Sequence, residues 1–169
     1  MKHTKWIAYF LVALLLLSMV ACGEENPPAG SSDVVPFSLT YQGVTVIPHE
    51  KAAPIIAALG EGYEYHESTS CAFVGLDKVY TYADIEIYTY PKGDEDFVLS
   101  VALRSDAVAT DKGITIGSSG DEVIDAYGEG ELHGSVSDGE IGYTAGNTYL
   151  KFLTRAGNVY YVEYGAITE

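Results

Sequence analysis

The side chains best suited to covalent chemistry in this 169-residue chain are its two cysteines, Cys22 and Cys71. A catalytic thiol needs a nearby histidine and a third group that orients it. The histidine closest to Cys71 in the sequence is His66, and the others share no ligand spacing with it. This pattern favours Cys71 as a small hydrophobic residue of the interior. We therefore predict no catalytic residues, and an envelope enzyme built on Cys71 or on scattered acids stays open as an alternative.

Two short segments have compositions that other proteins use for phosphate or metal binding. Gly117-Ser-Ser-Gly120 lacks the Gly-Lys-Ser/Thr ending of a phosphate loop, so helix capping explains it better. Gly93-Asp-Glu-Asp96 gathers carboxylates, which attract Ca²⁺, but without the spacing of an EF-hand. Because no His-Glu-x-x-His or paired Cys-x-x-Cys motif occurs, we expect no metal site and no cofactor. A structural or calcium-stabilised surface protein is a further alternative.

Tyrosine is the most distinctive residue type, with 14 copies beside a single tryptophan. The residues from 79 to 90 alternate as in a β-strand, with room for a bend near Ala83, and this pattern predicts that four tyrosines share one face: Tyr80, Tyr82, Tyr88 and Tyr90. If helices cover the opposite face, that of Ile85 and Ile87, the tyrosines lie on the open face of an antiparallel sheet. Tyrosine suits recognition because one end is apolar and the other forms hydrogen bonds. We predict a partner-binding role, although cross-strand pairing also accounts for tyrosine in exposed strands.

The elements that position these residues follow a repeated pattern. The segment 113–128 predicts a short strand, a turn and an amphipathic helix, with Ser119 and Glu122 fitting a capping box and Gly128 ending the helix. Gly113-Ile-Thr-Ile116 echoes Gly43-Val-Thr-Val46, which precedes a short helix at 54–59. Strand-like runs follow each copy. The predicted fold class is α+β, with two tandem helix-plus-antiparallel-sheet units at residues 37–112 and 113–169.

The strands expected in each unit alternate with turn signals. In the first unit we predict strands at 37–41, 44–47, 79–90 and 97–104, and an irregular stretch at 61–70. The strand at 97–104 is expected to direct Phe97, Leu99, Val101 and Leu103 to one face. In the second unit we predict strands near 140–144, 148–154 and 158–164, where Leu150 and Phe152 oppose Tyr149 and Lys151.

The first 21 residues have the form of a secretory signal peptide. A basic head precedes the apolar run Trp6–Val20, which is shorter than the roughly 20 residues of a transmembrane helix. Met19-Val20-Ala21-Cys22 resembles the lipobox of bacterial lipoproteins, with Met19 in place of the usual leucine. The resemblance implies cleavage before Cys22, attachment of a diacylglycerol with palmitate-type chains to its sulfur, and anchoring at the outer face of the cell membrane. Residues 22–36 are rich in Gly, Pro, Ser and acid, which predicts a disordered tether.

The charge balance narrows the range of partners. The formal net charge is −15 at pH 7, and removal of the signal peptide takes away Lys2 and Lys5 and no acid. Such a domain repels nucleic acid and anionic lipid surfaces, so we expect no nucleic-acid partner. Solubility at a crowded surface accounts for the charge, and a cationic partner is the alternative explanation.

Several strings resemble a family of uncharacterised lipoproteins of Gram-positive, Clostridia-type bacteria. They are Ser70-Cys-Ala-Phe-Val-Gly-Leu-Asp-Lys-Val-Tyr-Thr-Tyr82, Ile87-Tyr-Thr-Tyr-Pro91, Gly113-Ile-Thr-Ile-Gly117 and Ala126-Tyr-Gly128. At the level of the fold, the repeated helix-then-sheet unit is similar to the β-lactamase inhibitor protein, whose concave sheet grips an enzyme. The lipoprotein family has no settled activity, and this sequence has no loop specific to the inhibitor. The tyrosine face therefore carries the prediction of a non-catalytic protein- or ligand-binding module, with enzyme inhibition as an alternative.

Overall fold

The computed structural model describes residues 34–168, so the predicted signal peptide, Cys22 and most of the tether lie outside the described residues. The N-terminal half contains β1 (Leu39–Tyr41), β2 (Val44–Val46), α2 (Ala52–Leu59), β3 (Glu64–Thr69), β4 (Leu76–Thr81), β5 (Ile85–Lys92) and β6 (Glu95–Leu103). The C-terminal half contains α3 (Gly120–Tyr127), β7 (Glu131–Gly134), β8 (Gly139–Ala145), β9 (Thr148–Arg155) and β10 (Asn158–Ala166). Neither helix is long and apolar enough to cross a membrane.

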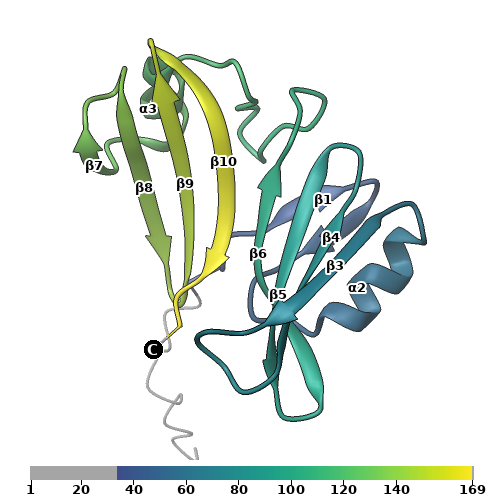
Figure 1. Cartoon of the computed structure of the whole chain (residues 1–169). Helices are drawn as coiled ribbons and strands as arrows, with labels where there is room; N and C mark the ends of the chain where they lie inside the picture. Colours follow the sequence, from purple (N-terminus) through teal and green to yellow (C-terminus); the bar gives the residue numbers. More distant parts are fainter. Residues whose placement is uncertain (1–33, 169) are drawn as a thin grey trace, which may run out of the picture. The chain divides into compact units, whose positions relative to one another are not determined.

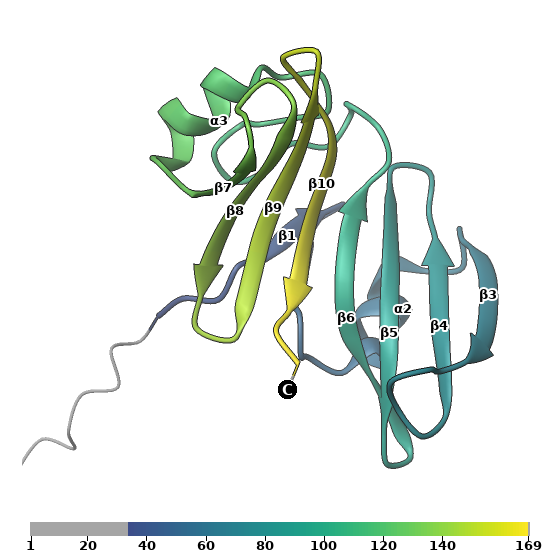
Figure 2. The same cartoon turned by 60° about the vertical axis from the view of Figure 1, so that its left-hand side comes forward.

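One antiparallel sheet of eight strands runs through both halves, in the order β3-β4-β5-β6-β10-β9-β8-β7 (Figure 1). The short β1–β2 hairpin forms a separate two-stranded sheet. The chain therefore belongs to the broad α+β class, as the sequence predicted. The hairpin, α2 and α3 lie on the same face of the large sheet (Figure 2), and we call the opposite face the open face.

The hydrophobic core fills the space between the large sheet and the elements that cover it. Strands alternate between buried and half-exposed residues, because successive side chains of a strand point to opposite faces. In β9 the side chains of Leu150 and Phe152 are fully buried, whereas Tyr149 and Lys151 are half-exposed, as predicted. Val123 of α3 packs into the same core.

The helix ends follow from their sequences. The predicted capping box is confirmed at α3, where Ser119 Oγ accepts a hydrogen bond from the Glu122 amide at 3.2 Å. The Glu122 carboxylate in turn accepts one from the Ser119 amide at 2.7 Å, so two free amides are satisfied. Helix α2 begins two residues before its predicted start, because Pro54 is tolerated in a first turn.

The segment from 79 to 90 is strand on both sides of Ala83, but the change of direction there is a full turn that divides it into β4 and β5, so the predicted continuous alternation is wrong. The Tyr82 amide donates to the Ile85 carbonyl at 2.9 Å and reverses the chain. In the resulting antiparallel pair, Tyr80 stands opposite Ile87 and therefore shares its helix-covered face. Tyr82 is buried in the core on that side. The four predicted tyrosines thus do not share one face.

Several further expectations differ from the structure. The stretch at 61–70 contains the edge strand β3, and 131–134 forms the edge strand β7, both fully exposed and without alternating burial. Ile114–Ile116 lies in turns and irregular backbone instead of the expected short strand. A bulge in β6 leaves Leu99 out of the pairing, so Val98 instead of Leu99 joins the core. Cys71 is exposed in the β3–β4 connection, not buried as predicted.

The two halves meet where β6 pairs with β10, through Glu163 and Ala102, Tyr164 and Val101, and Gly165 and Ser100. Beyond this pairing, the His49 ring connects the halves. Its Nδ1 lies 3.1 Å from the Tyr90 hydroxyl and its Nε2 lies 3.1 Å from the Asn147 carbonyl oxygen. A carbonyl oxygen only accepts, so Nε2 carries a proton.

We expect Phe152→Ala to lower the free energy of unfolding by about 3–5 kcal/mol, because it leaves a cavity in a fully buried site. Chemical denaturation measures the change. Leu132→Ala, at a side chain that is 44% exposed, is the control, with a change of about 0.5 kcal/mol or less. Equal effects of the two substitutions would contradict the placement of the core.

Candidate functional site

The open face carries polar side chains in rows that follow the strand register. One row crosses all eight strands, each residue standing opposite the next: Glu64, Thr81, Glu86, Ala102, Glu163, Lys151, Gly142 and Glu131. The neighbouring row contains His66, Val79, Tyr88, Ser100, Gly165, Tyr149 and Thr144. Ala102 in the first row, and Ser100 and Gly165 in the second, are small residues near the centre of the face. They leave space for the larger side chains on either side.

Glu163 is the centre of this face. Glu163 is only 8% exposed, and burying an unpaired carboxylate to this extent would destabilise the fold. Three neighbours compensate the charge: the hydroxyls of Tyr149 and Tyr161 donate hydrogen bonds to its two oxygens, and Lys151 Nζ lies 3.1 Å from Oε1. Glu163 therefore holds both tyrosine rings in fixed positions.

The position of the Tyr149 ring also requires the glycine at 165. A Cβ atom at Gly165 would collide with the Tyr149 ring carbons and hydroxyl. The ring thus lies flat across the sheet, over the strand that joins the two halves. From there its hydroxyl reaches Glu163.

A second carboxylate organises the β4–β5 side of the face. Glu86 accepts hydrogen bonds from the Tyr88 hydroxyl and, at 2.7 Å, from Thr81 Oγ1. Partial burial alone would raise the pKa of Glu86, but these two hydrogen bonds and the Arg104 charge lower it below its usual value. Glu86 is therefore ionised at neutral pH, and it fixes Tyr88 as Glu163 fixes Tyr149.

The tyrosines of this face are weaker acids than usual. Burial, followed by the hydrogen bond and charge of Glu86, raises the pKa of Tyr88 to about 12. Burial and Glu163 raise the pKa values of Tyr149 and Tyr161 further. These phenols are protonated at neutral pH, so they act as hydrogen-bonding and aromatic contact groups, not as bases.

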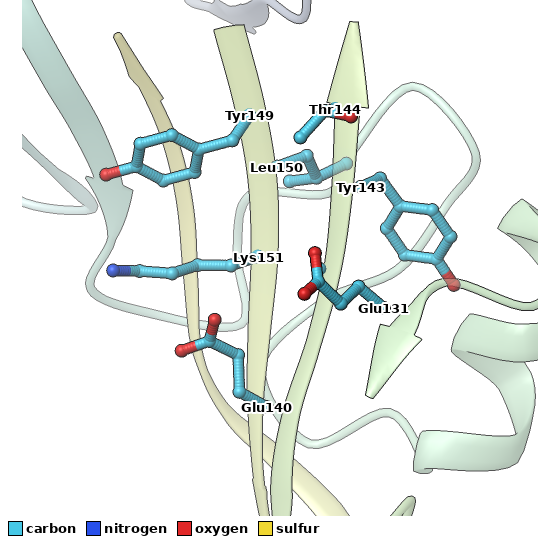
Figure 3. Close-up of a pocket in the computed structure, with 8 residues that line it drawn as sticks. Glu131, Glu140, Tyr143, Thr144, Tyr149, Leu150 and Lys151 are labelled. Carbon is cyan, nitrogen blue, oxygen red and sulfur yellow. The ribbon is translucent and has the colours of Figure 1, made fainter. Parts of the chain in front are cut away.

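A shallow depression of about 340 Å³ opens beside this cluster on β7–β9 (Figure 3). Glu131, Glu140, Tyr149 and Lys151 line it, and Gly142 contributes no side chain. Figure 3 shows Tyr149 and Lys151 extending side by side from β9, while Tyr143 points away from them. The depression therefore combines an aromatic wall with carboxylates.

The predicted site residues divide between the two faces. Tyr88 lies on the open face, and Tyr90 follows it there but is covered by Phe73 and His49, with ring centres 4.9 and 6.2 Å away. Tyr80 and Tyr82 pack on the helix side against Tyr63, with ring centres 5.1 and 5.4 Å from it.

Sequence reasoning missed Tyr149, Tyr161 and Glu163 as site residues. The alternation of 148–154 did place Tyr149 and Lys151 on one face, but nothing local indicates that this face stays uncovered.

The other candidate groups do not assemble into a site within residues 34–168. No group of three or more His, Cys, Asp or Glu side chains is arranged to hold a metal there. In the segment 93–96, Glu95 pairs with Lys51 at 2.7 Å and Asp96 pairs with Lys78 at 2.6 Å. These carboxylates are thus engaged by lysines, which disfavours calcium binding at this turn.

Comparison with protein-family models, with curated proteins and with solved structures finds no significant match to this chain. The tyrosines of the open face, held by Glu86 and Glu163, are suited to aromatic contact and hydrogen bonding.

The raised tyrosine pKa values predict alkaline sensitivity. In the unfolded chain tyrosine loses its proton near pH 10, whereas folded Tyr88 loses it near pH 12. The stability that Tyr88 contributes is fully present below about pH 10 and is lost as the pH rises to about 12. Denaturation at a series of pH values should show this fall, and Tyr88→Phe should flatten it. Tyr160→Phe, at an exposed position, is the control, and an unchanged slope in Tyr88→Phe would contradict the assignment.

Proposed function

We propose that this chain is a non-catalytic, lipid-anchored lipoprotein whose open face binds another protein outside the cytoplasm. One observation carries the proposal. Tyr88, Tyr149 and Tyr161 are held by Glu86 and Glu163 on the sheet face that α2 and α3 leave uncovered. Tyrosines of this kind are typical of recognition surfaces.

The size of the face supports a protein partner over a small ligand. Eight strands at about 4.8 Å spacing give a width on the order of 35 Å. A stable protein interface covers about 800 Å² on each partner, which a face of this width accommodates. The depression at Gly142 is shallow, whereas small-molecule sites enclose most of their ligand.

The hydrogen bonds of the tyrosines favour binding for a second reason. An interface loses free energy when it must order flexible side chains. Because Glu163 already orients Tyr149 and Tyr161, this cost is reduced before a partner arrives. The face is thus preorganised for contact.

We also propose that residues 37–112 and 113–169 are two related units, like those of the β-lactamase inhibitor protein. The strand order supports this proposal, since β3 to β6 form one meander after α2, and β7 to β10 form another after α3. The two meanders meet in mirror order at β6 and β10.

For the anchor, we expect Cys22→Ser to abolish acylation and to release the protein from the membrane fraction. Two acyl chains are lost, and each buried methylene contributes about 0.8 kcal/mol of membrane affinity. Labelling with a radioactive fatty acid, followed by fractionation, measures both effects. Cys71→Ser should remain labelled and membrane-bound. Retention of label in Cys22→Ser would contradict lipid anchoring at this cysteine.

For the binding face, we expect Tyr88→Ser combined with Tyr149→Ser to abolish capture of a partner from an envelope extract of the source organism. The substitutions remove two aromatic contacts from the open face while leaving Glu163 paired with Lys151. Tyr65→Ser, at an exposed tyrosine on the covered side of the sheet, is the matched control and should retain the partner. Circular dichroism verifies that each variant is folded. Equal capture by the double variant and the native protein would refute the proposed surface.

A further inference from the structure

We propose that the protein bound by the open face presents a basic segment, and that its lysine or arginine side chains dock against the carboxylates of this face. The inference rests on the proposed function and specifies the chemistry of the partner. Two observations support it. The strand register brings more acidic than basic side chains to the open face, and the basic ones already have contacts within the chain.

Carboxylates outnumber cations on the open face. The register places the following acidic side chains there: Glu64, Asp77, Glu86, Glu95, Glu131, Glu140 and Glu163. The lysines and arginines on the same side are Lys92, Arg104, Lys151 and Arg155. The face with the tyrosines is thus itself negative, within a chain of net charge −15.

All four cations have contacts within the described residues. The charged groups of Lys92 and Arg155 lie over the rings of Phe97 and Tyr160, at 5.7 and 4.8 Å from the ring centres. Lys151 Nζ lies 3.1 Å from Glu163 Oε1, and Arg104 Nη1 donates to the Tyr82 carbonyl oxygen at 3.0 Å. Glu140 forms no ion pair with any residue from 34 to 168, and Glu131 contacts only His133 Nε2, at 3.3 Å. These two carboxylates are therefore open to a cation from outside.

The depression on β7–β9 supplies the shape for such a cation. Glu131 and Glu140 line it, Gly142 leaves its floor without a side chain, and Tyr149 forms one wall (Figure 3). Lys151 also lines it, but its charge is paired with Glu163, whereas Glu131 and Glu140 have no lysine or arginine partner among residues 34–168. An arginine fits these groups, because its guanidinium binds carboxylates and stacks on aromatic rings. We assign this depression as the anchor point for one basic side chain of the partner.

The charge of the whole face adds a longer-range effect. Complementary charge steers two proteins together and selects against wrong partners. The same charge repels acidic proteins and nucleic acid, so a basic partner is the one that this face attracts. The attraction should weaken as salt is added, since exposed charges are screened within about 10 Å at 0.1 M ionic strength.

The test measures peptide binding to the protein purified from membranes in a neutral detergent. The probe is a short peptide of alternating arginine and serine, and its twin carries glutamine at every arginine. Isothermal titration calorimetry should detect binding of the arginine peptide, with an affinity at least about ten-fold above that of the twin. The difference should shrink as the salt concentration rises.

Two double variants, which lose the same number of negative charges, show whether the arginine peptide binds at the depression. Glu131→Gln with Glu140→Gln should weaken binding of the arginine peptide at least about ten-fold, as expected when charge pairs at an interface are lost. Glu61→Gln with Asp125→Asn removes exposed acids beside α2 and on α3, on the covered side. This control should weaken binding less than about two-fold.

The outcomes separate this inference from the proposed function. Equal weakening by both double variants, or equal binding of the two peptides, would overturn the basic-segment inference. A captured partner whose cross-linked segment contains no lysine or arginine would also overturn it. If capture of that partner still required Tyr88 and Tyr149, the proposed function would stand. Absence of any tyrosine-dependent partner would refute the proposed function itself.

Discussion

The pairing of β6 with β10 is the interaction on which the rest of the structure depends. Three consecutive residue pairs join two four-stranded meanders into one sheet. Without this contact, Glu86 and Glu163 would belong to separate surfaces. With it, they stand in the same row, separated by Ala102, and the tyrosines that they orient face the same side. The open face is a product of that junction.

The junction also explains why the centre of the open face tolerates charge. A carboxylate as buried as Glu163 is stable only when donors surround it. Lys151 arrives from β9, and Tyr161 from the same strand as Glu163, while Tyr149 reaches across Gly165. Packing on the covered side holds these strands in register, since Phe152 and Val162 fill the core directly beneath. Core and recognition surface are therefore two sides of the same strands.

Local patterns predicted the C-terminal half better than the tyrosine-rich strands. The capping box at Ser119 depends on residues three positions apart, and it is confirmed. The alternation of β9 is likewise local, because every second side chain points the same way. The alternation from 79 to 90 continues in the sequence through a tight turn at Tyr82–Ile85. After the turn, residues at the same alternate positions point to the other face of the sheet, so the pattern predicted the wrong face. The edge strands β3 and β7 have no buried face, so no periodic signal marks them.

What the sequence by itself determined is therefore the α+β class, the capped helix at 120–127, most strand positions and the strongly negative charge. These properties arise from neighbours along the chain or from composition. Only the tertiary structure decided that Tyr88, Tyr149 and Tyr161 share the open face while Tyr80 and Tyr82 pack beneath α2. The physical reason is that a face is assigned by register between strands and by which side the helices cover. Both depend on contacts between residues far apart in the sequence, as Glu163 and Ala102 illustrate.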